Sequence, residues 1–149
     1  MAGSGSSQPV TIRRVGPADL RLVLEAAALF DAEPREDWTA GFVAREGHHF
    51  LIAYVGERPA GFVTGIEIIH PDKGNEMMLY ELGVDPAYRR QGIGRGLVGT
   101  LRDLAVARGC RGMWVPLARD DTAAMATYRS AGADTYEATA IMSWDFPPP

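Results

Sequence analysis

The sequence predicts an α/β protein in which helices cover both faces of one mixed β-sheet. Short apolar runs typical of strands alternate with amphipathic stretches typical of helices. Their order is strand, helix, helix, strand, strand, strand, helix, strand, helix, strand. The 149 residues, 46% of them hydrophobic, provide an ordinary core for such a protein. A chain of this length buries roughly 68–70% of its unfolded surface.

The first third of the chain is expected to form a strand and two helices. Residues 10–15 alternate between apolar and polar side chains, which favours a strand, and a Gly-Pro pair ends it. Apolar residues recur at helical spacing over 18–30, which predicts a helix. An acidic loop over 31–38 follows, and a short helix is expected over 39–45.

The middle of the chain is expected to form a hairpin, a third strand and a long helix. Two apolar runs, 50–55 and 60–69, are separated by a turn and together predict the hairpin. A further apolar run predicts a strand over 77–84. A helical pattern covers 97–107, and Gly109 is a plausible end for that helix.

The last third is expected to add a strand, a helix and a final strand. Residues 112–117 predict the first of these strands. Asp120, Asp121 and Thr122 are good N-cap residues for a helix over about 123–130. Residues 135–146 are rich in β-formers and predict the last strand.

These elements are expected to form one domain over residues 10–146, because no repeat or linker divides the chain. Residues 1–9 are mostly Gly, Ser and Ala and predict a disordered leader or a cloning remnant. Residues 147–149 are three prolines and are expected to form a tail.

The composition excludes several classes of protein. A net charge of −4 disfavours a nucleic-acid partner, and no apolar run reaches the ~18 residues of a membrane span. Cys110 is the only cysteine, which excludes an internal disulfide and a cysteine-based zinc cluster. His48, His49 and His70 lack the spacing of metal ligands. We therefore expect a cytoplasmic protein without a metal, a membrane or a nucleic acid as partner.

The most informative stretch is residues 84–96, a basic Gly-rich loop between a strand and a helix. Free backbone N–H groups at a helix start bind phosphate, and Gly92 and Gly94 allow close approach. The P-loop string with its lysine is absent. The third glycine of a dinucleotide site is also missing. The loop therefore predicts a phosphorylated cofactor of another kind.

The loop resembles motif A of the GNAT N-acetyltransferases. Arg89-x-x-Gly92-x-Gly94 follows a strand end of the form Val84-x-Pro86, as in that motif. The helix that carries Tyr128 resembles the second motif of the family, and the element order is similar from residue 10 to residue 146. The resemblance implies the GNAT fold, a mixed central sheet flanked by helices, and acetyl-CoA as cofactor.

The resemblance also implies where acetyl-CoA lies. In GNAT folds the motif A strand diverges from its neighbour, and a free N–H, here that of Val84, polarises the thioester carbonyl. A tyrosine, here Tyr128, donates a proton to the departing CoA sulfur. The residues expected to contact the cofactor are Leu82, Gly83, Val84, Arg89, Arg90, Gln91, Gly92, Ile93, Gly94, Arg95 and Tyr128.

Glu81 is the candidate general base. Its side chain leaves the strand on the face opposite Tyr80 and Leu82, where burial would raise the pKa of its carboxyl toward a useful value. The alternative is a surface glutamate on a half-exposed strand. For Gly83, between Leu82 and Val84, the expected role is a β-bulge or a close approach.

A narrower resemblance is to the class I aminoglycoside 3-N-acetyltransferases. It implies acetyl transfer to an amine of an aminoglycoside, at the 3-amino position. That family often has an aspartate where this chain has Glu81. The resembling segments are 29–30, 79–84, 89–93, 120–121 ahead of Tyr128, and 142–146.

Carboxylates and aromatic side chains are the candidates for binding a small cationic amine. The expected contacts are Glu33, Trp38, Tyr80, Glu81, Asp120, Asp121 and Asp145. For any one carboxylate the alternative is a solvated surface, and Asp121 has a second alternative as a helix cap.

Two other functions stay open. One is a GNAT enzyme for another amine, such as a polyamine, an amino acid or a protein N-terminus. The other is a CoA-binding module without activity. Many GNAT proteins are dimers, so a homodimer is also expected from the resemblance.

Overall fold

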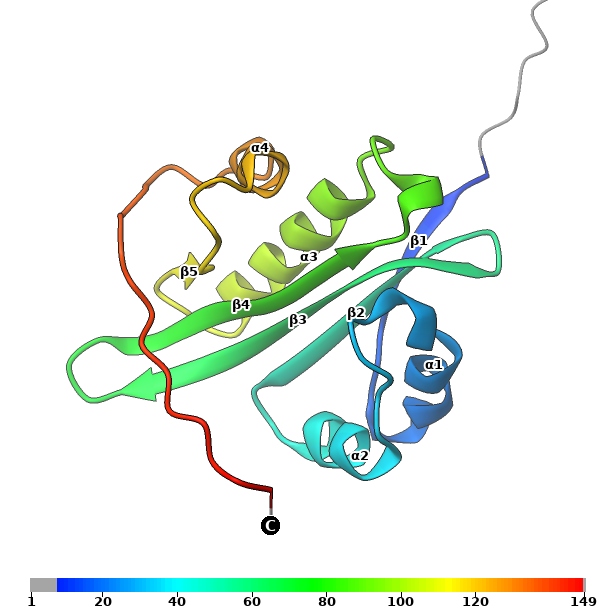
Figure 1. Cartoon of the computed structure of the whole chain (residues 1–149), viewed down its shortest axis with the longest axis horizontal. Helices are drawn as coiled ribbons and strands as arrows, with labels where there is room; N and C mark the ends of the chain where they lie inside the picture. The colour runs from blue at the N-terminus through cyan, green and yellow to red at the C-terminus, as the bar shows by residue number, and fades with distance from the viewer. Residues whose placement is uncertain (1–7, 149) are drawn as a thin grey trace, which may run out of the picture.

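The computed structural model describes residues 8–148, so residues 1–7 of the expected leader and residue 149 of the expected tail lie outside the described part. The strands form one five-stranded sheet in chain order (Figure 1). Neighbouring strands are antiparallel except the last two, which are parallel. The strands are β1 (Val10–Arg14), β2 (His48–Val55), β3 (Arg58–His70), β4 (Gly74–Val84) and β5 (Met113–Trp114).

Helices cover both faces of this sheet, so the predicted mixed α/β fold is confirmed (Figure 1). α1 (Leu20–Glu25) and α2 (Glu36–Ala44) lie on one face. α3 (Ile93–Ala107) and α4 (Thr122–Ser130) lie on the other. Single 3-10 turns cover Pro17–Asp19, Ala27–Leu29 and Pro86–Tyr88. No helix of the described residues is long and apolar enough to cross a membrane.

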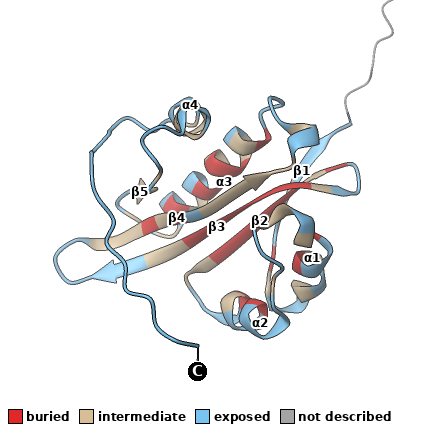
Figure 2. Ribbon diagram, in the orientation of Figure 1, coloured by how far each residue is buried: buried red, intermediate tan, exposed pale blue. Residues whose placement is uncertain are grey.

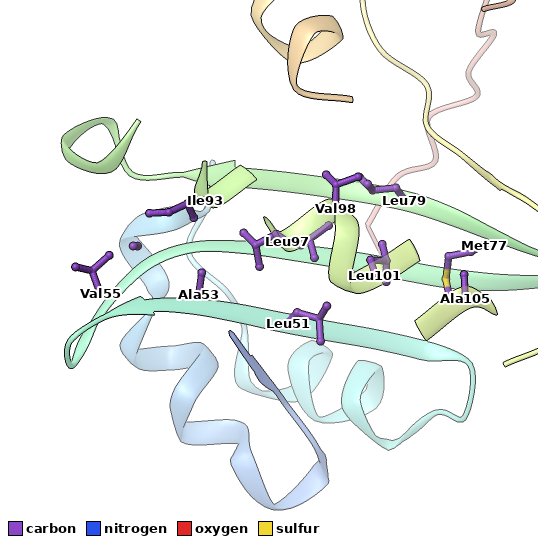
Figure 3. Packing of buried hydrophobic residues seen from close by; sticks show 12 residues of the cluster. Leu51, Ala53, Val55, Met77, Leu79, Ile93, Leu97, Val98, Leu101 and Ala105 are labelled. Carbon is purple, nitrogen blue, oxygen red and sulfur yellow. The ribbon is translucent and has the colours of Figure 1, made fainter. Parts of the chain in front are cut away.

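Two apolar clusters hold the helices to the sheet. On the α3 face, Leu97 and Leu101 are completely buried against Val63, Met77 and Leu79 (Figure 3). The buried side chains of α3 recur at helical spacing along the stripe that faces the sheet (Figure 2).

The cluster on the opposite face is largely aromatic. The ring of Phe62 stacks on that of Phe30, with the two centroids 4.2 Å apart, and on that of Phe50 at 5.7 Å. Val23 of α1 and Val43 of α2 are buried beside these rings. Aromatic pairs at this separation add about 0.5–1.5 kcal/mol each beyond the area that they bury.

A buried charged network joins the strands to the end of α3. The Glu67 carboxylate accepts hydrogen bonds from His49 Nε2 at 2.8 Å and from Arg108 Nε at 3.0 Å. Arg14 lies 3.1 Å from His49 Nδ1, and a guanidinium can only donate, so that nitrogen accepts and the ring is neutral. Burial accordingly lowers the pKa of His49. Burial opposes the ionisation of Glu67, but its hydrogen bonds outweigh this effect and leave the pKa of the carboxyl lowered.

Two helices begin earlier than expected, α2 at Glu36 and α3 at Ile93. Three other elements differ more. The helix expected over 18–30 is broken, because only Leu20–Glu25 is α-helical and 3-10 turns flank it. The strand expected over 112–117 is reduced to Met113–Trp114. The prediction of a last strand over 135–146 is wrong, because those residues form no strand. They are exposed and have no regular secondary structure, and they pair with no strand of the sheet.

Leu101→Ala should lower the free energy of unfolding by about 2–5 kcal/mol, since it removes a fully buried side chain and leaves a cavity. Val106 lies on the same helix and is 66% exposed, so Val106→Ala should stay within about 0.5 kcal/mol. Urea denaturation of both variants measures the difference. Equal losses would mean that the α3 face is packed differently.

Candidate functional site

β4 and β5 separate after a single short stretch of pairing. β5 pairs with β4 only at Met77 and Met78, so the rest of that edge of β4 has no neighbouring strand among the described residues. The divergence that the resemblance implied is therefore present. It leaves backbone groups along the second half of β4 without a strand partner.

The hydrogen-bonding register shows which backbone groups face this gap. Asp85 N–H donates to the Ala60 carbonyl at 2.8 Å, toward β3. Successive residues of an antiparallel ladder direct their N–H and C=O groups to alternate edges. The N–H of Gly83 therefore points toward β3, like that of Asp85. The N–H groups of Leu82 and Val84 point the other way, into the gap that β5 leaves along β4.

A β-bulge in β4 sets the direction of the side chains. Thr64 is opposite Glu81 while Gly65 is opposite Leu79, so Tyr80 is the extra residue. The extra residue shifts the alternation of side chains between the two faces of β4 by one position. Leu79, before the bulge, and Leu82, after it, therefore both pack on the α3 cluster.

The sequence offered a bulge or a close approach for Gly83, and the structure shows the close approach. A Cβ on this residue would lie 2.7 Å from Phe62 Cε1 and 3.0 Å from the Leu29 carbonyl oxygen. The 3-10 turn that ends at Leu29 therefore sits directly on β4. This contact brings the start of the acidic loop beside Glu81.

The loop before α3 is shaped for an anion. Gly92 is the N-cap residue in the left-handed conformation, with φ 78°, and Arg90 has φ 63°, which is uncommon for a residue with a side chain. The N–H groups of Ile93, Gly94 and Arg95 make no backbone hydrogen bond within the described chain. No side chain caps the helix, and its first turn holds no acidic residue.

Positive charge surrounds these free N–H groups. Arg89, Arg90 and Arg95 are exposed, and none forms an ion pair with a carboxylate of the described residues. The partial positive charge of the helix N-terminus adds to theirs. The loop thus combines donors, charge and space for a phosphate or pyrophosphate.

Thr127, the residue before Tyr128, lies next to this loop because α4 packs on the start of α3, and Tyr128 lines a groove beside Val98 and Met113. A Cβ on Gly94 would lie 3.2 Å from Thr127 Cγ2, 3.6 Å from Val84 Cγ2 and 3.9 Å from Leu82 Cδ2. The loop, the end of β4 and α4 therefore converge at this glycine. Burial, with a smaller effect from Asp121, raises the pKa of the Tyr128 phenol. The phenol thus stays protonated at neutral pH and can act as a donor.

Glu81 is half-buried and faces the side of the sheet that α1 and α2 cover. Burial, with a further contribution from the charge of Asp31, raises the pKa of its carboxyl. Opposite it, the Thr64 hydroxyl is buried and has no hydrogen-bond partner in the described residues. An unpaired buried hydroxyl is costly, so a ligand or water beside Glu81 would satisfy it.

The sequence reasoning did not single out Asp31 and Thr64. Each has a feature in the sequence that could have marked it as a candidate. Asp31 is the first residue of the acidic loop, and Thr64 is a polar residue within the apolar run of β3. The sequence could not supply the strand register that places Thr64 beside Glu81, or the packing of the Leu29 turn on Gly83 that brings Asp31 there.

The other residues expected to bind substrate are scattered. Trp38 is 68% exposed, and the Arg35 guanidinium lies 4.2 Å from its ring centroid. Asp121 caps α4 by accepting a hydrogen bond from Ala124 N–H at 3.0 Å. The remaining expected contacts are exposed and form no hydrogen bond or ion pair with Glu81. They are Glu33, Tyr80, Asp120 and Asp145.

A comparison with protein families decides what this geometry belongs to. The model of the Acetyltransferase (GNAT) family matches residues 20–133, which include the loop, β4 and Tyr128. The chain belongs to the GNAT acetyltransferase family. Family membership confirms three predictions: the GNAT fold, N-acetyltransferase activity and acetyl-CoA as the cofactor.

Curated relatives include N-acetyltransferases, among them one named for a ribosomal protein. The N-alpha-acetyltransferase RimI of Mycobacterium tuberculosis is 33% identical over 135 residues, which is 87% of this chain and 81% of RimI. The ribosomal protein bS18-alanine N-acetyltransferase of Escherichia coli is 31% identical over 94 residues. This chain spans 60% of the length of that enzyme, and 36% of an uncharacterized Mycobacterium leprae protein that is 32% identical.

Solved structures of similar fold include aminoglycoside acetyltransferases. One from an uncultured soil metagenomic sample, in complex with trehalose, has a TM-score of 0.84 at 20% identity. The match covers 93% of this chain and 97% of that one. An aminoglycoside N-acetyltransferase in complex with CoA has a TM-score of 0.76 at 16% identity, with 94% and 97% covered. At these identities the likeness shows the fold, and the 3-N class stays a prediction.

Arg95→Pro should weaken CoA binding about tenfold relative to Arg95→Ala. Both variants remove the charge, but only proline removes the N–H that has no backbone partner, and one charge-assisted hydrogen bond is worth about 1.5 kcal/mol or more. Proline is tolerated in the first helical turn. Calorimetric titration with CoA measures the difference, and thermal unfolding checks that both variants fold. Equal affinities would exclude this N–H as a phosphate donor.

Proposed function

We propose that the protein transfers the acetyl group of acetyl-CoA to an amine of a small polycationic acceptor of the aminoglycoside type, at the 3-amino position. The observation that supports it is the pair of carboxylates at Glu81 and Asp31, on the face opposite the basic loop. A cationic acceptor would be drawn to this face. The anionic cofactor would be drawn to the other.

β4 presents groups to both faces, because Glu81 points to the face of α1 and α2 whereas Leu82 and Val84 pack on the α3 face. The pyrophosphate of acetyl-CoA would lie on the free N–H groups at the start of α3, and its thioester arm would enter the gap between β4 and β5. There the N–H groups of Leu82 and Val84 can donate to the thioester carbonyl. These donors matter most when the oxygen becomes negative in the tetrahedral intermediate.

The chemistry needs one base and one acid. Glu81 takes a proton from the acceptor ammonium, directly or through a water held by Thr64, and so frees the nitrogen lone pair. The nitrogen then forms a bond to the carbonyl carbon and releases its second proton to solvent, and the carbon–sulfur bond breaks. Tyr128 donates its proton to the departing thiolate and regains one from solvent. The raised pKa values of both side chains suit these roles.

The second candidate acceptor is the N-terminal amine of a protein. The observation that favours it is the 33% identity to the mycobacterial RimI over most of both chains. A peptide N-terminus also presents an ammonium group to Glu81, so the chemistry at this residue is the same.

A thiol-release assay over matched panels separates the acceptors. We expect turnover with aminoglycosides that carry a 3-amino group and none with peptides that begin with alanine. Product mass and NMR then locate the acetyl group. Turnover on the peptides alone would overturn the aminoglycoside proposal and leave the acetyltransferase intact. Tight CoA binding with no turnover on any amine would overturn both.

Tyr128→Phe should lower kcat about 100-fold, the scale of a lost general acid, and leave CoA affinity within a factor of two or so. Tyr136→Phe is the matched control, because Tyr136 is exposed and lies outside the site. Steady-state kinetics and calorimetry measure the two quantities. An unchanged kcat in Tyr128→Phe would remove this phenol from the mechanism.

Asp31→Asn should move the acid limb of the kcat/KM profile to lower pH. The reaction needs ionised Glu81, and its raised pKa means that activity falls as the pH drops through that value. Removing the neighbouring negative charge lowers the pKa of Glu81 toward its ordinary value. Glu33→Asn, in the same loop, should leave the limb in place. A limb that Asp31→Asn leaves in place, or that persists in Glu81→Gln, would contradict the assignment of Glu81.

A further inference from the structure

The groove that Tyr128 lines has a volume of about 460 Å³ and lies between α3, β5 and the end of α4. We call it the α3–α4 groove. Leu79 and Val98, both members of the buried cluster in Figure 3, line it. Its other apolar side chains include Ala105, Met113 and Val115. A volume of this size and an apolar lining are typical of a ligand pocket.

The α3–α4 groove shares residues with the gap between β4 and β5. Leu79 of β4 lines the groove, and Leu82, farther along the same strand, directs its N–H to the gap. Tyr128, the proton donor to the CoA sulfur in the proposed function, lines the groove as well. The groove therefore begins where the thioester of the cofactor is proposed to lie.

A thioester carbon is planar, and this leaves one direction for the rest of the acyl group. In the proposed position its oxygen is directed to the N–H groups of Leu82 and Val84, and its sulfur lies at Tyr128. The acceptor amine attacks perpendicular to this plane, from the face of Glu81. The third substituent of the carbon would therefore point toward the closed end of the gap, where Leu79 lines the groove.

The α3–α4 groove is far larger than an acetyl group needs. A methyl group is about the size of a water molecule, whose share of the liquid is about 30 Å³. Leu79 precedes Leu82 by roughly 7–10 Å along a strand that contains a bulge. With bonds of about 1.5 Å, an extended octanoyl tail reaches roughly 9 Å beyond its carbonyl carbon. A tail of that length would therefore reach the groove, whereas an acetyl methyl would not.

We propose that the enzyme also uses acyl-CoA donors of medium chain length, such as octanoyl-CoA, and binds the acyl tail in the α3–α4 groove; this rests on the thioester position of the proposed function. The bond changes are those of acetyl transfer. The amine nitrogen bonds to the acyl carbon, the carbon–sulfur bond breaks, and Glu81 and Tyr128 move the same protons. Arg102 and Arg111 also line the groove, but both are exposed, so their aliphatic stems cover the tail while their charges stay in water.

Binding of two unreactive thioethers tests the groove without any acceptor. S-ethyl-CoA has the chain length of acetyl-CoA, and S-octyl-CoA that of octanoyl-CoA. Each methylene that leaves water tightens binding about fourfold, so two buried methylenes already give more than about tenfold. Calorimetric titration should therefore show that S-octyl-CoA binds at least tenfold more tightly. Equal affinities would overturn the proposal and leave acetyl transfer intact.

Tryptophan substitutions on two walls of the groove show whether the tail lies there. Ala131→Trp, after α4, and Gly112→Trp, before β5, each place an indole at the groove. A Cβ on Gly112 meets no atom within 4 Å, so this variant introduces no clash at its root. Both should bring the two thioether affinities within about threefold of each other. Ala126→Trp is the matched control, because Ala126 is exposed on α4 and outside the groove. An octyl preference that survives both groove variants, or that the control also loses, would overturn the proposal.

A photo-reactive group at the end of an octanoyl-CoA analogue reports directly where the tail lies. Trypsin cuts after arginine, so the peptides 103–108 and 112–119 report the groove, whereas 22–35 and 36–45 report the face of α1 and α2. Label on the groove peptides is expected. Label on 22–35 or 36–45 would place the tail on the acceptor face and overturn the proposal. Titration and labelling do not read turnover, so their outcomes stand whether or not an aminoglycoside is acetylated.

Discussion

The divergence of β4 from β5 is the constraint on which the site depends. After Met78 the two parallel strands no longer pair, and the second half of β4 keeps one edge free of a strand. A free edge is normally a liability that a protein covers. Here it supplies two aligned N–H groups, at Leu82 and Val84. A continuous ladder would have satisfied these groups.

Close packing of glycines holds the other parts of the site against this edge. Gly83 admits the turn of Leu29 on one face, and Gly94 admits α4 on the other. The strained φ of Arg90 and the uncapped start of α3 are local costs of the loop. Such costs persist at sites where a ligand supplies the missing interactions.

The parts of the site that depend on local pattern could be predicted from the sequence. The basic Gly-rich loop, the helix of Tyr128 and the face of Glu81 all follow from residue spacing within one element. The bulge at Tyr80 could not be predicted, because it depends on the register between two strands. For the same reason the pairing of Thr64 with Glu81 was not foreseen, and the approach of Asp31 depends on the packing of the Leu29 turn against Gly83. The prediction of the last strand was wrong for a related reason. Alternation of apolar and polar residues identifies an apolar face but does not show which sheet edge, if any, the segment pairs with.

The brief pairing of β5 also divides the molecule into two grades of stability. β1 to β4 share long ladders and a continuous core, whereas β5 pairs with β4 only at Met77 and Met78, and α4 packs on α3 at the edge of that core. That part can open locally while the four-stranded ladder stays intact, so its amides have a lower-energy route to hydrogen exchange. A ligand that spans the start of α3 and α4 would link the two parts into one cooperative unit.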